Sequence, residues 1–534
     1  MIQVNNLSLS IYKGKDDLLK KVAKELKVKQ TDIIKFDVIK KSIDARKKED
    51  VKYVYSLAVE VKEETKLLKK LSGSINISKY EESTYILPQQ GGINLKHRPV
   101  VVGFGPAGIF AALSLARCGF KPIVIERGED VDKRSLSVDK FWEENILNTE
   151  SNVSFGEGGA GTFSDGKLNT MVKDKSGRNN EVLKTLVEFN APKDILTDPK
   201  PHIGTDLLKG IIKNIREEII KLGGEVRFSS KLEDINYKEG HLHSIKLNNG
   251  EILDCEVLVL AIGHSARDTF ELLYEKKLNI EAKSFAVGLR VQHPQSMINI
   301  SQYGKEAAEL LPTASYKLTT KSSAARGVYS FCMCPGGYVV NASTEKGGLA
   351  INGMSYHDRK SESANSAIIV TVDAKEFADE TPLAGMYLQR ELESKCYKAG
   401  NSYIPVQLLG DFIKGRESMK FGETKPCFKG KYTFSRLDKI LPDFIVAALK
   451  EAFAAFDKKI EGFAREDAIL AAIESRTSSP IRIVRDENLE ASIRGIYPSG
   501  EGAGYAGGIS SAAMDGLKVA EAIISKYNSN LINS

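Results

Sequence analysis

The chain has 534 residues, 42% of them hydrophobic, which is enough for roughly two to four domains with sizeable cores. Its six cysteines lack the density of a disulfide framework, and no positive-then-apolar leader opens the sequence, so we expect a cytoplasmic protein. The formal charge of +6 is uneven, because residues 1–96 hold 20 Lys and Arg against 13 Asp and Glu. The remainder is close to neutral, so the basic character belongs to the N-terminal segment alone.

Residues 1–90 are predicted to form a small basic α/β domain. A strand at 7–13, a helix at 16–26, two strands around a charged turn within 32–61, a helix at 63–71 and a last strand at 83–88 give the order βαββαβ. That order is typical of a ferredoxin-like unit. The lysines indicate either a solvated face or a site for RNA or another acidic partner, and we favour the solvated face. A linker is expected at 88–98.

The stretch VVVGFGPAGIFAALSLARCGFKPIVIERGE, residues 100–129, has two interpretations. No charge lies between positions 99 and 116, which is about the length of a short membrane span. Its glycines and Pro106, however, would leave a bilayer helix poorly formed. The same residues suit a strand at 100–102, a tight turn and a helix from 106 to about 118. We therefore expect no membrane span here.

The glycines of this turn have the spacing of a dinucleotide-binding loop. Gly103 permits the turn, Gly105 lets the backbone approach a pyrophosphate, and Gly108 lets helix and strand pack closely. A second strand at 123–125 ends in Glu126, the position from which an acid holds a ribose hydroxyl. The combination predicts a dinucleotide site.

The rest of the chain supports an α/β fold with an insertion. A helix at 206–222 and strands within 225–265 follow the loop, with a turn at Asn249-Gly250. The pattern is less regular and richer in strands from 285 to 480, and a glycine-rich loop then enters a helix. We expect a Rossmann-like domain at 96–284, a β-rich α+β substrate domain inserted at 285–484, and a return to the first domain at 485–534.

Three segments carry a resemblance to known flavoproteins: 101–128, CEVLVLAIGHSA (255–266) and GEGAGYAGGI (500–509). They resemble the FAD-contacting segments of glutathione-reductase-type enzymes. Together with GEGGAGTFSDGKLNT (156–170) and the basic N-terminal domain, they resemble the poorly characterised bacterial FAD-dependent dehydrogenase (NAD(FAD)-utilising dehydrogenase-like) family. The resemblance implies FAD as cofactor and a hydride-transferring dehydrogenase.

The expected FAD ligands lie in four groups. The first loop would cradle the pyrophosphate, Glu126 would hold the ribose, the 156–170 loop would line the ring, and a second helix N-terminus would face the flavin. A 2′-phosphate, as in NADP, would meet like charge at Glu126. Arg127 beside it weakens this exclusion of NADP but is expected at the surface. The pattern of the family that the chain resembles often has Gly-Asp near this turn, where this chain has Gly500-Glu501. The residues assigned are Gly103, Gly105, Pro106, Ala107, Gly108, Glu126, Arg127, Gly159, Gly161, Ser164, Asp165, Lys167, Gly263, Gly500, Glu501, Gly507, Gly508 and Ile509.

The catalytic base, if substrate oxidation needs one, is sought among His264, His293 and His357, with Arg290 beside His293 at the start of the substrate domain. Each histidine could equally serve packing. A second GxGxxG unit is missing, so NAD(P)H would bind transiently in the substrate cleft, or the electrons would come from the small-molecule substrate itself.

Two rival chemistries are weaker. Cys332 and Cys334 form a CxC pair rather than CxxC, and a CxC disulfide closes a small strained ring, so we expect an ordinary strand pair. No Cys or His spacing predicts a metal. The sequence thus predicts an FAD-dependent oxidoreductase; the alternative is a flavin-containing RNA-associated or redox-sensing protein with little turnover. Substrate and oligomeric state are not readable from it.

Overall fold

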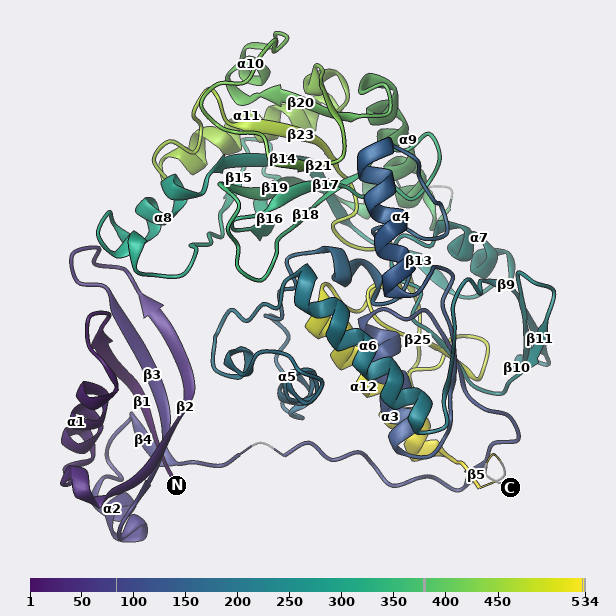
Figure 1. The fold of residues 1–534 in the computed structure, drawn as a ribbon. Coiled ribbons are helices and arrows are strands. Elements are labelled where there is room, and N and C mark those ends of the chain that lie inside the picture. Colours follow the sequence, from purple (N-terminus) through teal and green to yellow (C-terminus); the bar gives the residue numbers. More distant parts are fainter. Residues whose placement is uncertain (83, 378–380, 531, 533–534) are drawn as a thin grey trace.

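The structure, a computed structural model, describes residues 1–82, 84–377, 381–530 and 532. Figure 1 shows an N-terminal sheet on one side, an extended connector leading away from it, a central part with long helices, and a large sheet with its helices at the top. The cleft described below belongs to the central part and the large sheet.

The N-terminal unit has the predicted βαββαβ order. Its four strands form an antiparallel sheet in the order β2-β3-β1-β4. The elements are β1 (Ile2–Ser10), α1 (Lys15–Leu26), β2 (Ile33–Asp44), β3 (Lys52–Val61), α2 (Glu64–Lys70) and β4 (Ile77–Lys79). Helix α1 buries Leu18, Val22 and Leu26 against the sheet because these residues recur on one face.

The last strand of this unit was predicted in the wrong place. Residues 84–88 form no strand, and residue 83 lies outside the described residues. The sheet is completed instead by β4, which pairs with β1. Apolar residues alternate with others in 84–88 because the connector crosses the helices of the central part here, and Tyr85 and Leu87 pack against those helices.

The central part is built on a five-stranded parallel sheet in the order β25-β12-β6-β7-β8. Its strands are β6 (Val100–Val102), β7 (Ile123–Ile125), β8 (Glu225–Arg227), β12 (Leu258–Leu260) and β25 (Ile496–Pro498). The predicted strand at 100–102, helix and second strand are confirmed as the unit β6, α3 (Pro106–Arg117), β7.

Both faces of this sheet are covered, which explains why its strands are continuously apolar. Val101 packs into a core with α3, α5 (Arg178–Glu188), α6 (Thr205–Lys221) and α12 (Ile509–Lys526). Val100 and Val102 point the other way, toward a second core. That core is shared with α7 (Arg267–Glu275) and an antiparallel sheet of β9 (Leu232–Lys238), β10 (His241–Leu247) and β11 (Ile252–Asp254). The predicted turn at Asn249-Gly250 joins β10 to β11, with Gly250 at φ +85°.

The segment between β12 and β25 forms the large sheet, in the order β15-β16-β19-β14-β23-β20-β22. The chain enters and leaves it through the antiparallel ribbon of β13 (Ile280–Ala282) and β24 (Ile481–Ile483). The large sheet comprises β14 (Phe285–Pro294), β15 (Thr319–Lys321), β16 (Gly327–Cys334), β19 (Ser363–Val372), β20 (Ile404–Leu408), β22 (Tyr432–Phe434) and β23 (Ile469–Glu474). Beside it lie a small sheet of β17 (Tyr338–Asn341), β18 (Ile351–Met354) and β21 (Phe428–Lys429), and helices α8 (Gln295–Tyr303), α9 (Ala384–Ala399), α10 (Leu409–Lys414) and α11 (Asp443–Asp457). We call residues 285–480 the cap.

Two further pairings close the central part. β5 (Ile93–Asn94) pairs with β26 (Tyr527–Asn528), so the connector ends beside the end of α12. Helix α4 (Val131–Glu144) runs from the central part toward the cap (Figure 1). Within the described residues, no helix has the length and apolar character needed to cross a bilayer.

Candidate functional site

A cleft opens where the carboxyl ends of β6, β7 and β12 meet the N-termini of α3 and α12. The carboxyl edge of a parallel sheet is where such folds bind ligands. Of the predicted cofactor residues, the cleft is lined by Gly103, Gly105, Pro106, Ala107, Glu126, Arg127, Gly159, Gly161, Ser164, Asp165, Lys167, Gly263, Glu501, Gly508 and Ile509. Gly108, Gly500 and Gly507 are not among the lining residues.

The three glycines of the first loop differ in what requires a residue without a side chain. Gly103 has φ +96°, and a Cβ there would lie 2.4 Å from the carbonyl oxygen of Ala261. A Cβ on Gly108 would lie 1.9 Å from the carbonyl oxygen of Gly103, so this glycine serves close packing of helix and strand rather than contact with a ligand. A Cβ on Gly105 would meet only the Cα of Gly159, at 3.7 Å. Protein packing therefore does not require glycine at 105, and the space beside it is free for a ligand.

Glu126 is a buried carboxylate at the end of β7. It accepts hydrogen bonds from the backbone N–H groups of Phe104 at 2.8 Å and of Gly128 and Gly156 at 2.9 Å. A carboxylate has about four acceptor positions, so capacity remains for a ribose hydroxyl. Glu126 also fixes the loop at 156, a structural role that the sequence did not reveal.

Arg127 was predicted to lie at the surface, and this was wrong. Its side chain is only 13% exposed and forms ion pairs of 2.8 Å with both Glu150 and Asp268. The guanidinium also lies over the ring of Phe155, 4.2 Å from its centroid. Two carboxylates already compensate this charge, because the fold brings residues from three separate segments together at the end of β7.

The 156–170 loop is ordered by buried polar contacts. The fully buried guanidinium of Arg134 donates to the carbonyl oxygens of Glu157 and Gly159 in this loop and of Asn152 and Val153 just before it. Asp165 accepts from Ser355 and, at 2.6 Å, from Arg359 of the cap, and lies 3.7 Å from Lys167. Burial would raise the pKa of Asp165, but the charges of Lys167 and Arg359 outweigh it and lower that pKa. Asp165 thus joins the loop to the cap.

The C-terminal loop brings a second helix N-terminus to the cleft. Gly508 precedes α12, has φ +97°, and a Cβ there would meet no atom within 4 Å. Glu501 lies 3.1 Å from Nδ1 of His264. Burial alone would raise the pKa of Glu501, but the charge and hydrogen bond of His264 outweigh it, and the pKa is lowered. Gly500 packs against Ala107 instead: a Cβ would lie 2.7 Å from that side chain.

Of the predicted catalytic residues, only His264 lines the cleft. His293 is fully buried among apolar side chains, and its Nε2 is 2.7 Å from the carbonyl oxygen of Phe463. Arg290 is also fully buried, with Nε 2.9 Å from Glu474 and Nη1 2.7 Å from Asn365. The assignment of His293 and Arg290 to the catalytic site was wrong because β14 is a central strand, buried on both faces.

His357 does not line the cleft either. Its ring stacks on that of His202 with centroids 5.4 Å apart, and its Nδ1 is 2.9 Å from the carbonyl oxygen of Ile203. It therefore fixes the loop that follows β18.

The cap supplies a wall of the cleft that the sequence analysis did not assign to the site. This wall consists of Phe331, Cys332, Asn352, Glu474, Arg476 and Thr477. Glu474 connects to the buried Arg290, so Arg290 supports the wall from behind. The only sequence pattern that could have pointed here was the CxC pair, which was interpreted as structural.

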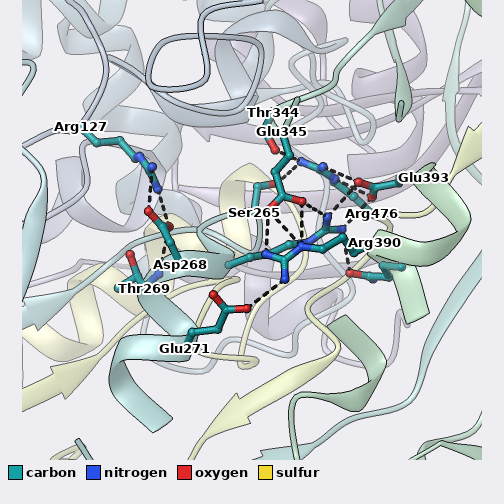
Figure 2. A network of polar contacts seen from close by, with 12 residues as sticks. Arg127, Ser265, Asp268, Thr269, Glu271, Thr344, Glu345, Arg390, Glu393 and Arg476 are labelled. Carbon is teal, nitrogen blue, oxygen red and sulfur yellow. Dashed lines mark hydrogen bonds and ion pairs between the residues drawn. The ribbon is translucent and has the colours of Figure 1, made fainter. Parts of the chain in front are cut away.

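Figure 2 shows how the central part and the cap are joined at the cleft. Glu393 of α9 is fully buried, pairs at 2.7 Å with Arg267 at the start of α7 and at 2.7 Å with Arg476, and accepts from Ser475. Arg476 in turn donates to Thr344 and Ser265. Since Ser265 and Arg476 both line the cleft, this network sets the position of one wall relative to the other.

Comparison with known proteins identifies relatives along the whole chain. A Clostridium beijerinckii (strain ATCC 51743 / NCIMB 8052) protein, described as uncharacterized, is 54% identical over 533 residues, covering 99% of each chain. The chain belongs to the same family as that protein. The family model described as "FAD-dependent protein, C-terminal domain-like" matches residues 284–477, and a domain of unknown function matches residues 1–60. FAD is the cofactor of the present protein.

Solved structures resemble the chain only distantly. An L-proline dehydrogenase from P. horikoshii gives a TM-score of 0.31 at 13% identity, over 80% of this chain and 93% of that one. A geranylgeranyl bacteriochlorophyll reductase-like protein from Thermoplasma acidophilum gives 0.34 at 13% identity, over 80% and 78%. A halogenase in complex with FAD gives 0.37 at 10% identity, over 79% and 67%.

The residues of the cleft fit FAD. Gly105 leaves free space in front of the N-terminus of α3, Gly508 leaves free space in front of α12, and Glu126 retains acceptor capacity at the end of β7. These three features come from segments far apart in the sequence, as an extended dinucleotide requires.

Proposed function

We propose that this family member is an FAD-dependent oxidoreductase that acts as a dehydrogenase on a small-molecule substrate. Residues 96–284 and 485–534 would form the FAD-binding domain, and 285–484 the substrate domain. The observation that supports this most directly is the His264–Glu501 pair at 3.1 Å, in the wall of the cleft that also holds both helix N-termini. Bound FAD supplies the redox chemistry by accepting a hydride from the substrate.

The chain itself would supply proton transfer and orientation. The Glu501 carboxylate beside Nδ1 of His264 favours the tautomer with its proton on Nδ1, which leaves Nε2 as the basic nitrogen. His264 would then take the proton that substrate oxidation releases. Arg476 and Lys167 line the same cleft and would orient an anionic substrate group.

An anaerobic screen of metabolites and of NADH and NADPH, followed by bleaching of the flavin absorbance, tests this function. We expect rapid bleaching by one chemical class and a reduction rate that falls by about 10²–10⁴-fold in His264→Gln, with FAD content retained. The control is His243→Gln, which replaces an exposed histidine on β10, outside the cleft. A flavin that no metabolite or nicotinamide reduces, or equal rates in both variants, would contradict the proposal.

A further inference from the structure

A pair of cysteines, Cys332 and Cys334, lies at the C-terminal end of strand β16, in the part of the cap that borders the FAD cleft. Cys332 lines the cleft and is partly exposed, whereas Cys334 is buried. Phe331 pairs with Ala367 of β19 and Cys334 with Asn365, so β16 contains one more residue than its partner at this point. Such bulges re-aim side chains and are common beside active sites.

The backbone at Cys332 is held in an unusual conformation. Its φ is +41°, in the left-handed region that a non-glycine residue adopts at a cost of about 1–3 kcal/mol. The carbonyl oxygen of Cys332 accepts from Nη1 of the buried Arg290 at 3.1 Å and from Sγ of Cys334 at 3.3 Å. These two contacts hold the bulge, and with it the exposed thiol, at the cleft.

The two thiols differ sharply in acidity. A hydrogen bond with Cys334 lowers the pKa of Cys332, and the charges of Lys167 and Arg290 lower it further, against the effect of burial. The same hydrogen bond and burial raise the pKa of Cys334 well above its usual range. Cys332 is therefore the thiol that ionises first, and Cys334 is placed to resolve a bond formed by Cys332.

We propose that Cys332 and Cys334 form a redox-active dithiol that exchanges an electron pair with FAD and with a thiol-containing substrate. Starting from the two reduced cysteines, two S–H equivalents are lost, one S–S bond forms, and the two electrons and two protons reduce FAD. An external dithiol then reduces the new disulfide by exchange through a mixed disulfide and leaves as a disulfide itself. The small ring closed by a CxC pair is strained, and strained disulfides are the labile, catalytic ones rather than the structural ones.

This inference goes beyond the proposed dehydrogenase function and shares with it only the requirement that FAD binds in the cleft. No other described cysteine lines the cleft. Cys427, partly exposed in the cap but outside the cleft, is therefore a matched control.

The first test is spectroscopic. A thiolate in contact with oxidised flavin gives long-wavelength charge-transfer absorbance. In holoprotein whose cysteines are reduced and whose flavin is oxidised, at neutral pH, we expect this absorbance in the wild type and in Cys427→Ser, and its loss in Cys332→Ser. Acidification should weaken it in the wild type, in step with protonation of Cys332. Absorbance that persists in Cys332→Ser would overturn the assignment of the thiolate.

The second test follows the transfer of electrons from thiols to the flavin. Anaerobic addition of dithiothreitol should bleach the flavin in the wild type and in Cys427→Ser, and at least about 100-fold more slowly in Cys332→Ser and Cys334→Ser. In a second experiment without dithiothreitol, thiols are titrated in denaturant after the enzyme's own cysteines have reduced the flavin. We expect two thiols fewer than the six of the wild-type sequence, and likewise two fewer than the five of Cys427→Ser. Equal bleaching in all variants, or no loss of thiols, would overturn the proposal.

The outcomes separate the two proposals. A metabolite that bleaches the flavin equally in the wild type and in Cys332→Ser would support the dehydrogenase and contradict the dithiol. Loss of two thiols without bleaching by any non-thiol metabolite would support the dithiol and contradict the dehydrogenase.

Discussion

Gly105 is a residue at which only a ligand requires glycine. The protein leaves a Cβ at this position 3.7 Å from its nearest neighbour, and the φ of −84° is open to any residue. The free space that it leaves in front of α3 would admit a pyrophosphate. This differs from Gly103 and Gly108, whose substitution would disturb the protein itself.

We predict that Gly105→Val loses FAD while keeping its fold, because the branched side chain occupies the pyrophosphate space. Flavin content per chain after purification and reconstitution measures binding, and circular dichroism measures the fold. Gly73→Val, at a position where a Cβ meets no atom within 4 Å, is the control and should retain its flavin. Full flavin content in Gly105→Val would show that the pyrophosphate binds elsewhere.

His293 makes a residue-scale contribution to the pH dependence of stability. Burial lowers its pKa from 6.5 to about 4. Below pH 6.5 the unfolded chain binds a proton that the folded chain does not take up until about pH 4, so the free energy of unfolding falls as the pH is lowered through this window. At pH 5 the loss is about 2 kcal/mol relative to pH 7.5.

We expect His293→Gln to remove this part of the pH dependence, since glutamine keeps an N–H donor for the carbonyl oxygen of Phe463 but does not titrate. Urea unfolding at pH 7.5 and at pH 5 measures the difference. Parallel losses of stability in the wild type and the variant would show that other groups dominate this window.

At the scale of elements, α7 and α9 are joined by a buried ion network rather than by apolar packing alone. Glu393 of α9 compensates both Arg267 and Arg476, and all three side chains are almost completely buried. Burial opposes ionisation of Glu393, but the two arginines outweigh it and lower its pKa well below the usual range. Removing the carboxylate would take from the buried Arg476 its ion pair and leave the buried Arg267 with the partly exposed Glu345 as its counter-charge.

Glu393→Gln should therefore lower the free energy of unfolding by about 3–5 kcal/mol, the usual cost of breaking a buried pair. Glu391→Gln on the same helix is the control: Glu391 is 58% exposed and pairs with Lys395, which is also exposed. Its loss should cost less than about 1 kcal/mol. The contrast is measured by urea unfolding, and similar losses in the two variants would mean that the network does not stabilise the junction.

At the scale of the whole molecule, the basic N-terminal unit touches the cap through a small apolar contact. Val51 beside the β2–β3 hairpin packs on Ala307 and Leu311. The backbone N–H of Lys41 donates to the carbonyl oxygen of Thr197 at 2.9 Å. No residue of this unit lines the cleft. These contacts favour a packing role for the unit over a role in binding FAD.

We expect deletion of residues 1–80 to leave FAD bound but to lower solubility, because the apolar contact on the cap becomes exposed. The cut spares Tyr85, which bonds to Glu521, and Gly91, which bonds to the carbonyl oxygen of Ile524. Flavin content, light scattering and retention on a polyanion column are the measurements. If the excess positive charge serves RNA or another acidic partner instead, the truncated protein would keep its flavin and solubility and lose a retention that weakens steeply with salt.

The sequence by itself determined the local parts of the candidate FAD site. The β6–α3–β7 unit, the acid at its end and the glycine loop before α12 were all predictable, because a tight turn, a helix start and a buried strand each depend on residues close together in the chain. The same holds for the order of elements in the N-terminal unit, although its last strand was displaced.

Only the tertiary structure decided which polar residues face the cleft. Arg290 and His293 look like exposed candidates in the sequence, but β14 lies between β19 and β23 and is buried from 285 to 293. Their partners, Glu474 and the carbonyl oxygen of Phe463, come from about 180 residues further along the chain. Cys332 reached the cleft through a bulge that no spacing rule predicts. Long-range pairing of strands sets burial in the cap, and burial decides whether a polar side chain stabilises the fold or takes part in chemistry.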